Sequence, residues 1–186
     1  NSSFNYTRSK MDGNTTIISR GCDLAAKKGI LVVVAAGNEG NSSWKYITAP
    51  ADADSVLTVG AVNAARQIAG FSSYGPTADG QINPDVAAIG LSAVIADQTT
   101  GAPTYNNGTS YACPIMAGIV TCLWQAFPEI NNMGIIEVLR KSSDRTNMPD
   151  DRTGYGIPDA KKAFVSLIKK LYTQQISVDN NCKTTI

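Results

Sequence analysis

The sequence predicts an α/β fold of three layers, in which helices flank a mostly parallel sheet. Its two strongest strand candidates, Ile30–Ala36 and Ser55–Val62, are apolar without alternation, which is typical of strands buried on both faces. Helical patterns alternate with such strands, as they do in parallel sheets. The 186 residues are 43% hydrophobic and 17% charged, with a net charge of +1, which is the composition of a soluble globular domain with one core.

The first predicted helix covers Thr15–Lys28 and follows a polar surface loop over residues 1–14. Gly29 provides its C-terminal stop. Its apolar side chains gather on one face, which is the pattern of an amphipathic helix. They are Ile17, Ile18, Cys22, Leu24 and Ala25.

Shorter elements complete the predicted fold. Strands are expected at three places, the first of them weakened by Gly70: Gln67–Ser73, Val86–Ile89 and Leu91–Ala96. A hairpin or loop over Asp97–Asn107 leads to three further helices: Ser110–Ala126, Asn132–Lys141 and Asp159–Tyr172. The polar residues Thr173–Ile186 are expected to form a tail or linker.

Ser110 lies where the polar turn Tyr105–Gly108 changes into an apolar helix. A hydroxyl at the N-terminus of a buried helix is close to unpaired backbone N–H groups and to the positive end of the helix dipole. This setting stabilises an alkoxide or an oxyanion and therefore suits a nucleophile. The alternative role for this serine is a helix N-cap, and Pro114, assigned to the first turn, fits both roles.

Asn38 follows the carboxyl end of the first buried strand, where open α/β sheets place their ligands. Its side-chain amide can donate to a developing oxyanion. A turn asparagine is one alternative, and a nucleotide-binding turn is another. The stretch Gly37–Gly40 lacks the full dinucleotide spacing, however, and carries Glu39 where a phosphate would lie.

Together these two stretches resemble the subtilisin family of serine proteases. The nucleophile motif of that family is matched by Gly108, Thr109, Ser110, Ala112 and Pro114, and its oxyanion motif by Ala36, Gly37 and Asn38. Further matches lie between the two motifs in the order of the family: Ala49–Ala51, Ser55–Ala61, Phe71–Pro76 and Pro84–Ala88. The resemblance extends from Thr15 to Phe164.

One departure from the family is large. The general base of the family is a His oriented by an Asp, and both precede the oxyanion Asn. This chain has no His and begins after the place of the Asp motif. The resemblance therefore implies the carboxyl-terminal part of a catalytic domain over residues 1–168, with the end of the last helix and a tail or linker over 169–186. The fold is accordingly expected to be incomplete, and the His and Asp are expected from a missing upstream segment.

The resemblance implies a serine endopeptidase that acts on proteins or peptides. Ser110 would attack the peptide carbonyl and form an acyl-enzyme, while Asn38 and the backbone N–H of Ser110 would bind the oxyanion. The implied substrate-binding residues include Ala35, Ala36 and Gly37, which would form one wall of a roomy pocket for the side chain before the scissile bond. Thr109 is also implied in substrate binding, and Asn107 would lie on the leaving side. This chain alone is expected to be inactive, because a serine without a base is a weak nucleophile.

Three alternatives to this function remain open. A sedolisin-type acid peptidase shares the Gly-Thr-Ser stretch but would carry an Asp in place of Asn38. A non-catalytic binding or assembly module would have kept the subtilisin fold and lost the base. An unrelated nucleotide-binding α/β protein would bind its ligand at Asn38.

The expected partners are a protein or peptide substrate and the missing amino-terminal part of the domain, or other copies of the chain that cover an open sheet edge. The near-neutral charge argues against nucleic acid. The apolar run Ala112–Phe127 is too short to span a bilayer. The resemblance implies a secreted or cell-envelope location.

No cofactor is required by the implied mechanism. The family often binds calcium, but no dense carboxylate loop in this sequence assigns such a site. With no His and no Cys-x-x-Cys pair, a zinc site is not expected. The four cysteines are expected to be small buried hydrophobic residues: Cys22, Cys113, Cys122 and Cys182. The Asn-x-Ser/Thr triplets are interpreted as composition and not as glycosylation sites; they begin at Asn1, Asn5, Asn14, Asn41 and Asn107.

Overall fold

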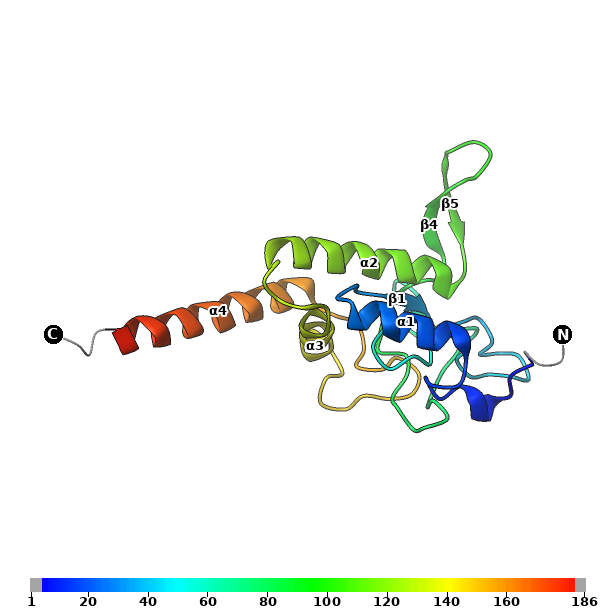
Figure 1. The fold of residues 1–186 in the computed structure, drawn as a ribbon. Coiled ribbons are helices and arrows are strands. Elements are labelled where there is room, and N and C mark those ends of the chain that lie inside the picture. The colour runs from blue at the N-terminus through cyan, green and yellow to red at the C-terminus, as the bar shows by residue number, and fades with distance from the viewer. Residues whose placement is uncertain (1–4, 183–186) are drawn as a thin grey trace.

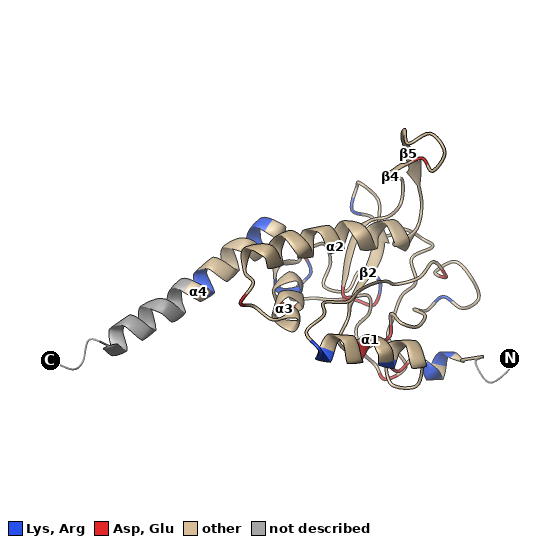
Figure 2. Ribbon diagram, turned by 45° about the horizontal axis from the view of Figure 1, so that its top comes forward, with Lys and Arg blue, Asp and Glu red and all other residues tan. Residues whose placement is uncertain are grey.

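The computed structural model of the chain describes residues 5–182, and a parallel sheet lies at the centre. Its strands are β1 (Val33–Ala35), β2 (Leu57–Val62) and β3 (Val86–Ile89), with β2 in the middle. The register sets Val34 opposite Thr58 and Gly60 opposite Ala87. Figure 2 shows the sheet between two helices, α2 (Thr109–Ala126) and α1 (Ile17–Lys27). The predicted α/β class, with a parallel sheet flanked by helices, is thus confirmed.

The main core forms where α2 packs along the three strands. Every residue of β2 is buried, because α2 covers one of its faces while loops cover the other, where Gly60 approaches the ring of Pro84. The core continues into α3 (Asn132–Ser142) and α4 (Ala160–Cys182), which pack against each other. Its fully buried side chains include Leu57, Val59, Met116, Ile135, Ile136, Leu139 and Leu167. Each such side chain stabilises the fold by about 1.5–3 kcal/mol relative to an exposed one.

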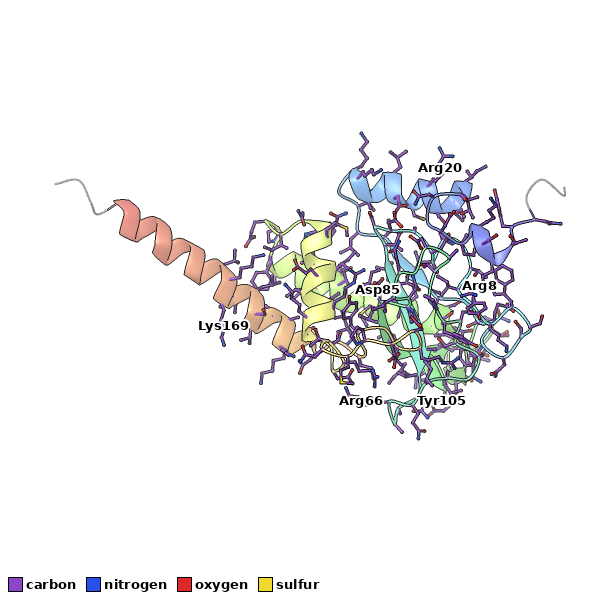
Figure 3. All side chains as sticks on the ribbon, turned by 90° about the horizontal axis from the view of Figure 1, so that it is seen from below. Arg8, Arg20, Arg66, Asp85, Tyr105 and Lys169 are labelled. Atoms are coloured by element: carbon purple, nitrogen blue, oxygen red, sulfur yellow. The ribbon has the colours of Figure 1, made fainter. Side chains whose placement is uncertain are left out.

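An ion pair between half-buried Arg140 and buried Asp85 links α3 to the sheet. Arg140 donates to Asp85 Oδ1 at 2.5 Å, and the backbone N–H of Thr58 donates to Asp85 Oδ2 at 2.7 Å. Figure 3 shows Asp85 inside the body of the molecule. Burial raises the pKa of the Asp85 carboxyl, against the opposing effect of Arg140. Removal of Arg140 would leave the buried Asp85 carboxyl without its ion pair, so this pair has a structural role.

A β-hairpin projects from the body beside the start of α2 (Figure 1). It pairs β4 (Ala93–Ala96) with β5 (Pro103–Asn106) in antiparallel register. The strand predicted at Leu91–Ala96 is therefore present but shorter, and the segment after it forms a hairpin. The strand predicted at Gln67–Ser73 is wrong: within the described residues this segment is irregular apart from a single bridge between Ile68 and Val62.

Helix α1 forms where the sequence predicts it, yet its largest apolar residues are exposed. Thr16 caps the helix by accepting a hydrogen bond from the backbone N–H of Ser19. Ile17, Ile18 and Leu24, however, are 66%, 55% and 59% exposed. The inward face is polar and is held by hydrogen bonds: Ser19 Oγ donates to Asp52 at 2.6 Å, and the backbone N–H of Ser55 donates to Asp23 at 2.8 Å. Periodicity locates an apolar face but does not say which partner covers it.

Strand β1 is also less buried than predicted. The sequence indicates a strand of seven residues covered on both faces, whereas β1 has three residues and all are half-buried. Within the described part of the chain, β2 is its only strand neighbour. One edge of β1 is therefore open, because no described strand lies beside it.

The end of the chain corrects two further predictions. Helix α4 continues to Cys182, so most of the tail predicted from Thr173 is helical, and residues 183–186 lie outside the described part. The described cysteines are free thiols that are only half-buried at Cys22 and Cys113 and exposed at Cys122. The prediction of buried cysteines is wrong at Cys122, where the side chain is exposed. The side chain of Cys182 lies outside the described part.

Candidate active site

The structure brings Asn38 and the start of α2 together at the carboxyl end of the sheet. Asn38 follows β1, and Thr109 is the first residue of α2. The backbone N–H of Thr109 donates to Asn38 Oδ1 at 2.9 Å, and the Thr109 hydroxyl donates to the same oxygen at 3.0 Å. Ser110 is the next residue, with its Cα about 3.8 Å from that of Thr109. Asn38 and Ser110 are therefore neighbours.

These two bonds determine which way the Asn38 amide points. Because both donors reach Oδ1, the amide nitrogen Nδ2 is directed away from Thr109. Among the described residues Nδ2 has no hydrogen-bond partner, and it lies 3.8 Å from the place that a Cβ on Gly108 would take. A Cβ at position 108 would therefore be in ordinary van der Waals contact with the amide. Asn38 is exposed, so its free N–H groups are available to an external oxyanion.

Ser110 is the second residue of α2, and its side chain is exposed. The N-cap residue is Gly108, with a φ of 157°, so the alternative that Ser110 itself caps the helix is wrong. The backbone N–H of Ser110 belongs to the first turn, whose N–H groups have no partner within the helix. Pro114 is the sixth residue of α2, so its predicted place in the first turn is wrong. Because proline has no N–H, the carbonyl of Ser110 lacks its helical hydrogen bond.

Thr109 and Ser73 hold the turn that carries Asn38. The N–H of Gly37 donates to the Thr109 hydroxyl at 3.2 Å, and the carbonyl of Gly37 accepts from the backbone N–H of Ser73 at 3.0 Å. Ser73 Oγ in turn accepts from the N–H of Glu39 at 2.9 Å. Gly37 has a φ of 106°, and a Cβ there would lie 2.9 Å from Ser73 Oγ. Both the conformation and the close approach therefore require glycine at this position.

The other predicted substrate-binding residues differ in how accessible they are. Ala36 is fully buried against Ile47, so only its backbone can line a pocket. Thr109 is also fully buried, and its hydroxyl is occupied by Gly37 and Asn38. Asn107 is exposed, with its Oδ1 accepting from the backbone N–H of Ser92 at 2.7 Å. Ala35, the last residue of β1, is half-buried.

Within the described residues, Ser110 Oγ has no side chain beside it that could act as a base through a hydrogen bond, and the whole sequence contains no His. Over the same described part of the chain, no group of three or more His, Cys, Asp or Glu residues could hold a metal ion. Calcium binding remains a prediction without assigned ligands. No helix in residues 5–182 is both long and apolar enough to cross a membrane.

The arrangement of these motifs agrees with a known family. Residues 1–156 match the model of the subtilase family, Peptidase_S8. The chain belongs to the subtilase family. The expected family and the expected subtilisin-like fold are both confirmed, and the match extends over the nucleophile and oxyanion motifs.

Individual relatives show the same family and how much of it this chain covers. Subtilisin DY of Bacillus licheniformis is 36% identical over 137 residues, which are 73% of this chain and 47% of the relative. The halolysin-like extracellular serine protease Nep of Natrialba magadii is 33% identical over 141 residues, covering 74% of this chain and 24% of the relative. The self-cleaved protease domain of PatA superimposes with a TM-score of 0.66 at 25% identity, over 81% of this chain and 54% of that one. The chain spans less than half the length of these two curated relatives.

Proposed function

We propose that this subtilase chain supplies the nucleophile and the oxyanion site of a serine endopeptidase, and that the general base comes from an amino-terminal part of the same catalytic domain. The observation that carries the proposal is the orientation of Asn38. Thr109 donates twice to the amide oxygen, which leaves Nδ2 without a hydrogen-bond partner among the described residues, and Ser110 follows Thr109 directly in the chain. A hydrogen-bond donor that is already oriented before the reaction stabilises a developing oxyanion without reorganisation.

The reaction would follow the acyl-enzyme route. Ser110 Oγ attacks the peptide carbonyl while a base removes the hydroxyl proton, and the carbonyl electrons move onto oxygen. Asn38 Nδ2 and the N–H of Ser110 donate to that oxyanion. Collapse of the intermediate expels the amine, which takes a proton from the protonated base, and water then hydrolyses the acyl-enzyme. The wall of the pocket before the scissile bond would be formed by Ala35, Gly37 and the backbone of Ala36, with Asn107 on the leaving side.

Open apolar surfaces support the proposal that an amino-terminal part of the domain completes the site. One is the outward face of α1 with Ile17 and Leu24, and another is the free edge of β1. A third is an apolar groove between α2 and α4, lined by Pro114, Ile115, Gly118, Ile119, Cys122 and Phe164. Contiguous exposed apolar patches often mark interaction sites. We propose that the amino-terminal part of the domain covers these surfaces. When that part is absent, other copies of this chain would cover them.

The same proposal gives the protein a secreted or cell-envelope location and a protein or peptide substrate with a large apolar side chain before the scissile bond. The location follows from the named relatives, of which Nep is described as extracellular. The substrate preference follows from the small residues at positions 35–37, which leave room for a large side chain.

The experiment is peptide hydrolysis by the full-length protein that contains this chain. Ser110→Ala is expected to abolish turnover and acyl-enzyme formation, detected by mass spectrometry. Ser43→Ala is the matched control, because Ser43 is exposed and lies outside both motifs. A folded wild-type protein that hydrolyses nothing would favour the binding or assembly module, and turnover that survives Ser110→Ala would overturn the assignment of the nucleophile.

A further inference from the structure

We infer that Ser73 is a positioning residue that sets the place of Asn38 for catalysis; this inference rests on the proposed function. Ser73 belongs to neither the nucleophile motif nor the oxyanion motif. It follows an irregular segment and is fully buried. Its hydroxyl is not exposed to a substrate, so any effect on the reaction must pass through another residue.

The contacts of Ser73 fall on the two residues that flank Asn38. Its backbone N–H donates to the carbonyl of Gly37 at 3.0 Å, and its Oγ accepts from the N–H of Glu39 at 2.9 Å. One residue further along, the N–H of Gly40 donates to the carbonyl of Phe71 at 2.8 Å. The segment 71–73 therefore holds the backbone of the Asn38 turn on both sides.

Thr109 and Ser73 thus position different parts of Asn38. Thr109 orients the side-chain amide of Asn38 from the start of α2. Ser73 fixes the backbone from which that side chain extends. Both are needed in an oxyanion site, because the donor must reach a position about 2.7–3.1 Å from the oxyanion, and a displacement of about 1 Å can cost about 10²-fold in rate.

Loss of the Ser73 hydroxyl would affect this turn first. The N–H of Glu39 has no other acceptor among the described residues, and an unpaired backbone donor in a partly buried turn is unfavourable. The turn would shift until that N–H reaches water or another acceptor. Because the Gly37 backbone packs tightly against Ser73, the shift would also alter the position of Asn38.

The neighbouring serine provides a matched control. Ser72 is equally buried, and its Oγ also accepts from a backbone N–H, that of Ala61 at 3.0 Å. That bond lies in β2 and not in the Asn38 turn. Ser72→Ala and Ser73→Ala therefore each remove a hydroxyl that accepts from a backbone N–H. Only Ser73→Ala removes a hydrogen bond to the turn that carries Asn38.

The test is a double-mutant cycle in the full-length protein, with kcat and KM measured on a peptide substrate. Ser73→Ala is expected to lower kcat by about 10-fold and to leave KM within about two-fold, since the oxyanion forms only in the transition state. Ser72→Ala is expected to leave kcat within about two-fold. In an Asn38→Ala background, Ser73→Ala should cause no further loss, because the residue that it positions is gone.

Two results would overturn the inference. One is that Ser72→Ala and Ser73→Ala change kcat equally, and the other is that Ser73→Ala lowers kcat by the same factor in the Asn38→Ala background as in the wild type. Ser73→Cys keeps the shape of the side chain, with a somewhat larger atom in place of the oxygen, and weakens the acceptor, so it replaces Ser73→Ala in the cycle if that variant fails to fold. Failure of the proposed function has a different signature, which is turnover that does not depend on Ser110.

Discussion

The carboxyl end of the sheet and the outer face of α1 are built in opposite ways. At the first, Thr109 holds the side chain of Asn38, and Ser73 holds the backbone of the residues on either side of it, through hydrogen bonds made within this chain. At the second, Ile17 and Leu24 are mostly exposed. Under the proposed function, the contrast separates a nucleophile and oxyanion donor that this chain positions by itself from a base and an apolar cover that come from the rest of the domain. The following variants test each side of this contrast.

The largest effect is expected at the carboxyl end of the sheet. Asn38→Ala removes the oxyanion donor and should lower kcat of the full-length protein by about 10²–10³, which is the loss known for a subtilisin that lacks the same donor. Asn41→Ala, at an exposed position of the same loop, is the control and should leave kcat unchanged. A loss of about ten-fold or less at Asn38 would mean that its amide does not reach the oxyanion.

A second pair of variants compares a covered helix face with the uncovered one. Leu139 in α3 is fully buried, so Leu139→Ala should destabilise the full-length protein by about 2–5 kcal/mol. Leu24 in α1 is 59% exposed here, and a surface position would change stability by less than about 0.5 kcal/mol. We expect Leu24→Ala to cost more than that in the full-length protein, because the proposal places the rest of the domain over it. Urea denaturation measures both, and a neutral Leu24→Ala would show that the α1 face stays open.

The smallest expected effect is chemical and concerns two thiols on α2. Burial raises the pKa of the Cys113 thiol, so less thiolate forms at a given pH, and the thiolate is the reactive species. Cys122 is exposed on the same helix. At about pH 8, iodoacetamide should modify Cys122 several-fold faster than Cys113, as followed by peptide mapping of the isolated chain. In the full-length protein the difference should shrink or reverse if the groove that contains Cys122 is covered.

Local sequence patterns predict most of the elements correctly. The strand Val86–Ile89 has the predicted bounds, and the long helix after Gly108 begins one residue earlier than expected. The proximity of Asn38 to Ser110 was predictable because both motifs lie at the carboxyl end of a parallel sheet. Apolar runs, glycine stops and motif order are all properties of short stretches, and the sequence displays them directly.

The remaining features depend on contacts between distant segments. The outward face of α1 could not be predicted, because the hydrogen bonds of Ser19 and Asp23 to the segment 52–55 decide which side turns inward. The half-buried state of β1 depends on which strands lie beside it. Ser73 gave no signal of its own beyond its place in the family match Phe71–Pro76, since its role comes from bonds to Gly37 and Glu39, which are far from it in the sequence.

The central claim is that Ser110 is a nucleophile whose base lies outside this chain. Labelling with a fluorophosphonate probe tests it most directly, with the isolated 186-residue chain and the full-length protein treated side by side and the adduct located by mass spectrometry. The account predicts rapid labelling of Ser110 in the full-length protein and none above background in the isolated chain, because a serine without a base is weakly nucleophilic. Equal, rapid labelling of Ser110 in both would contradict it.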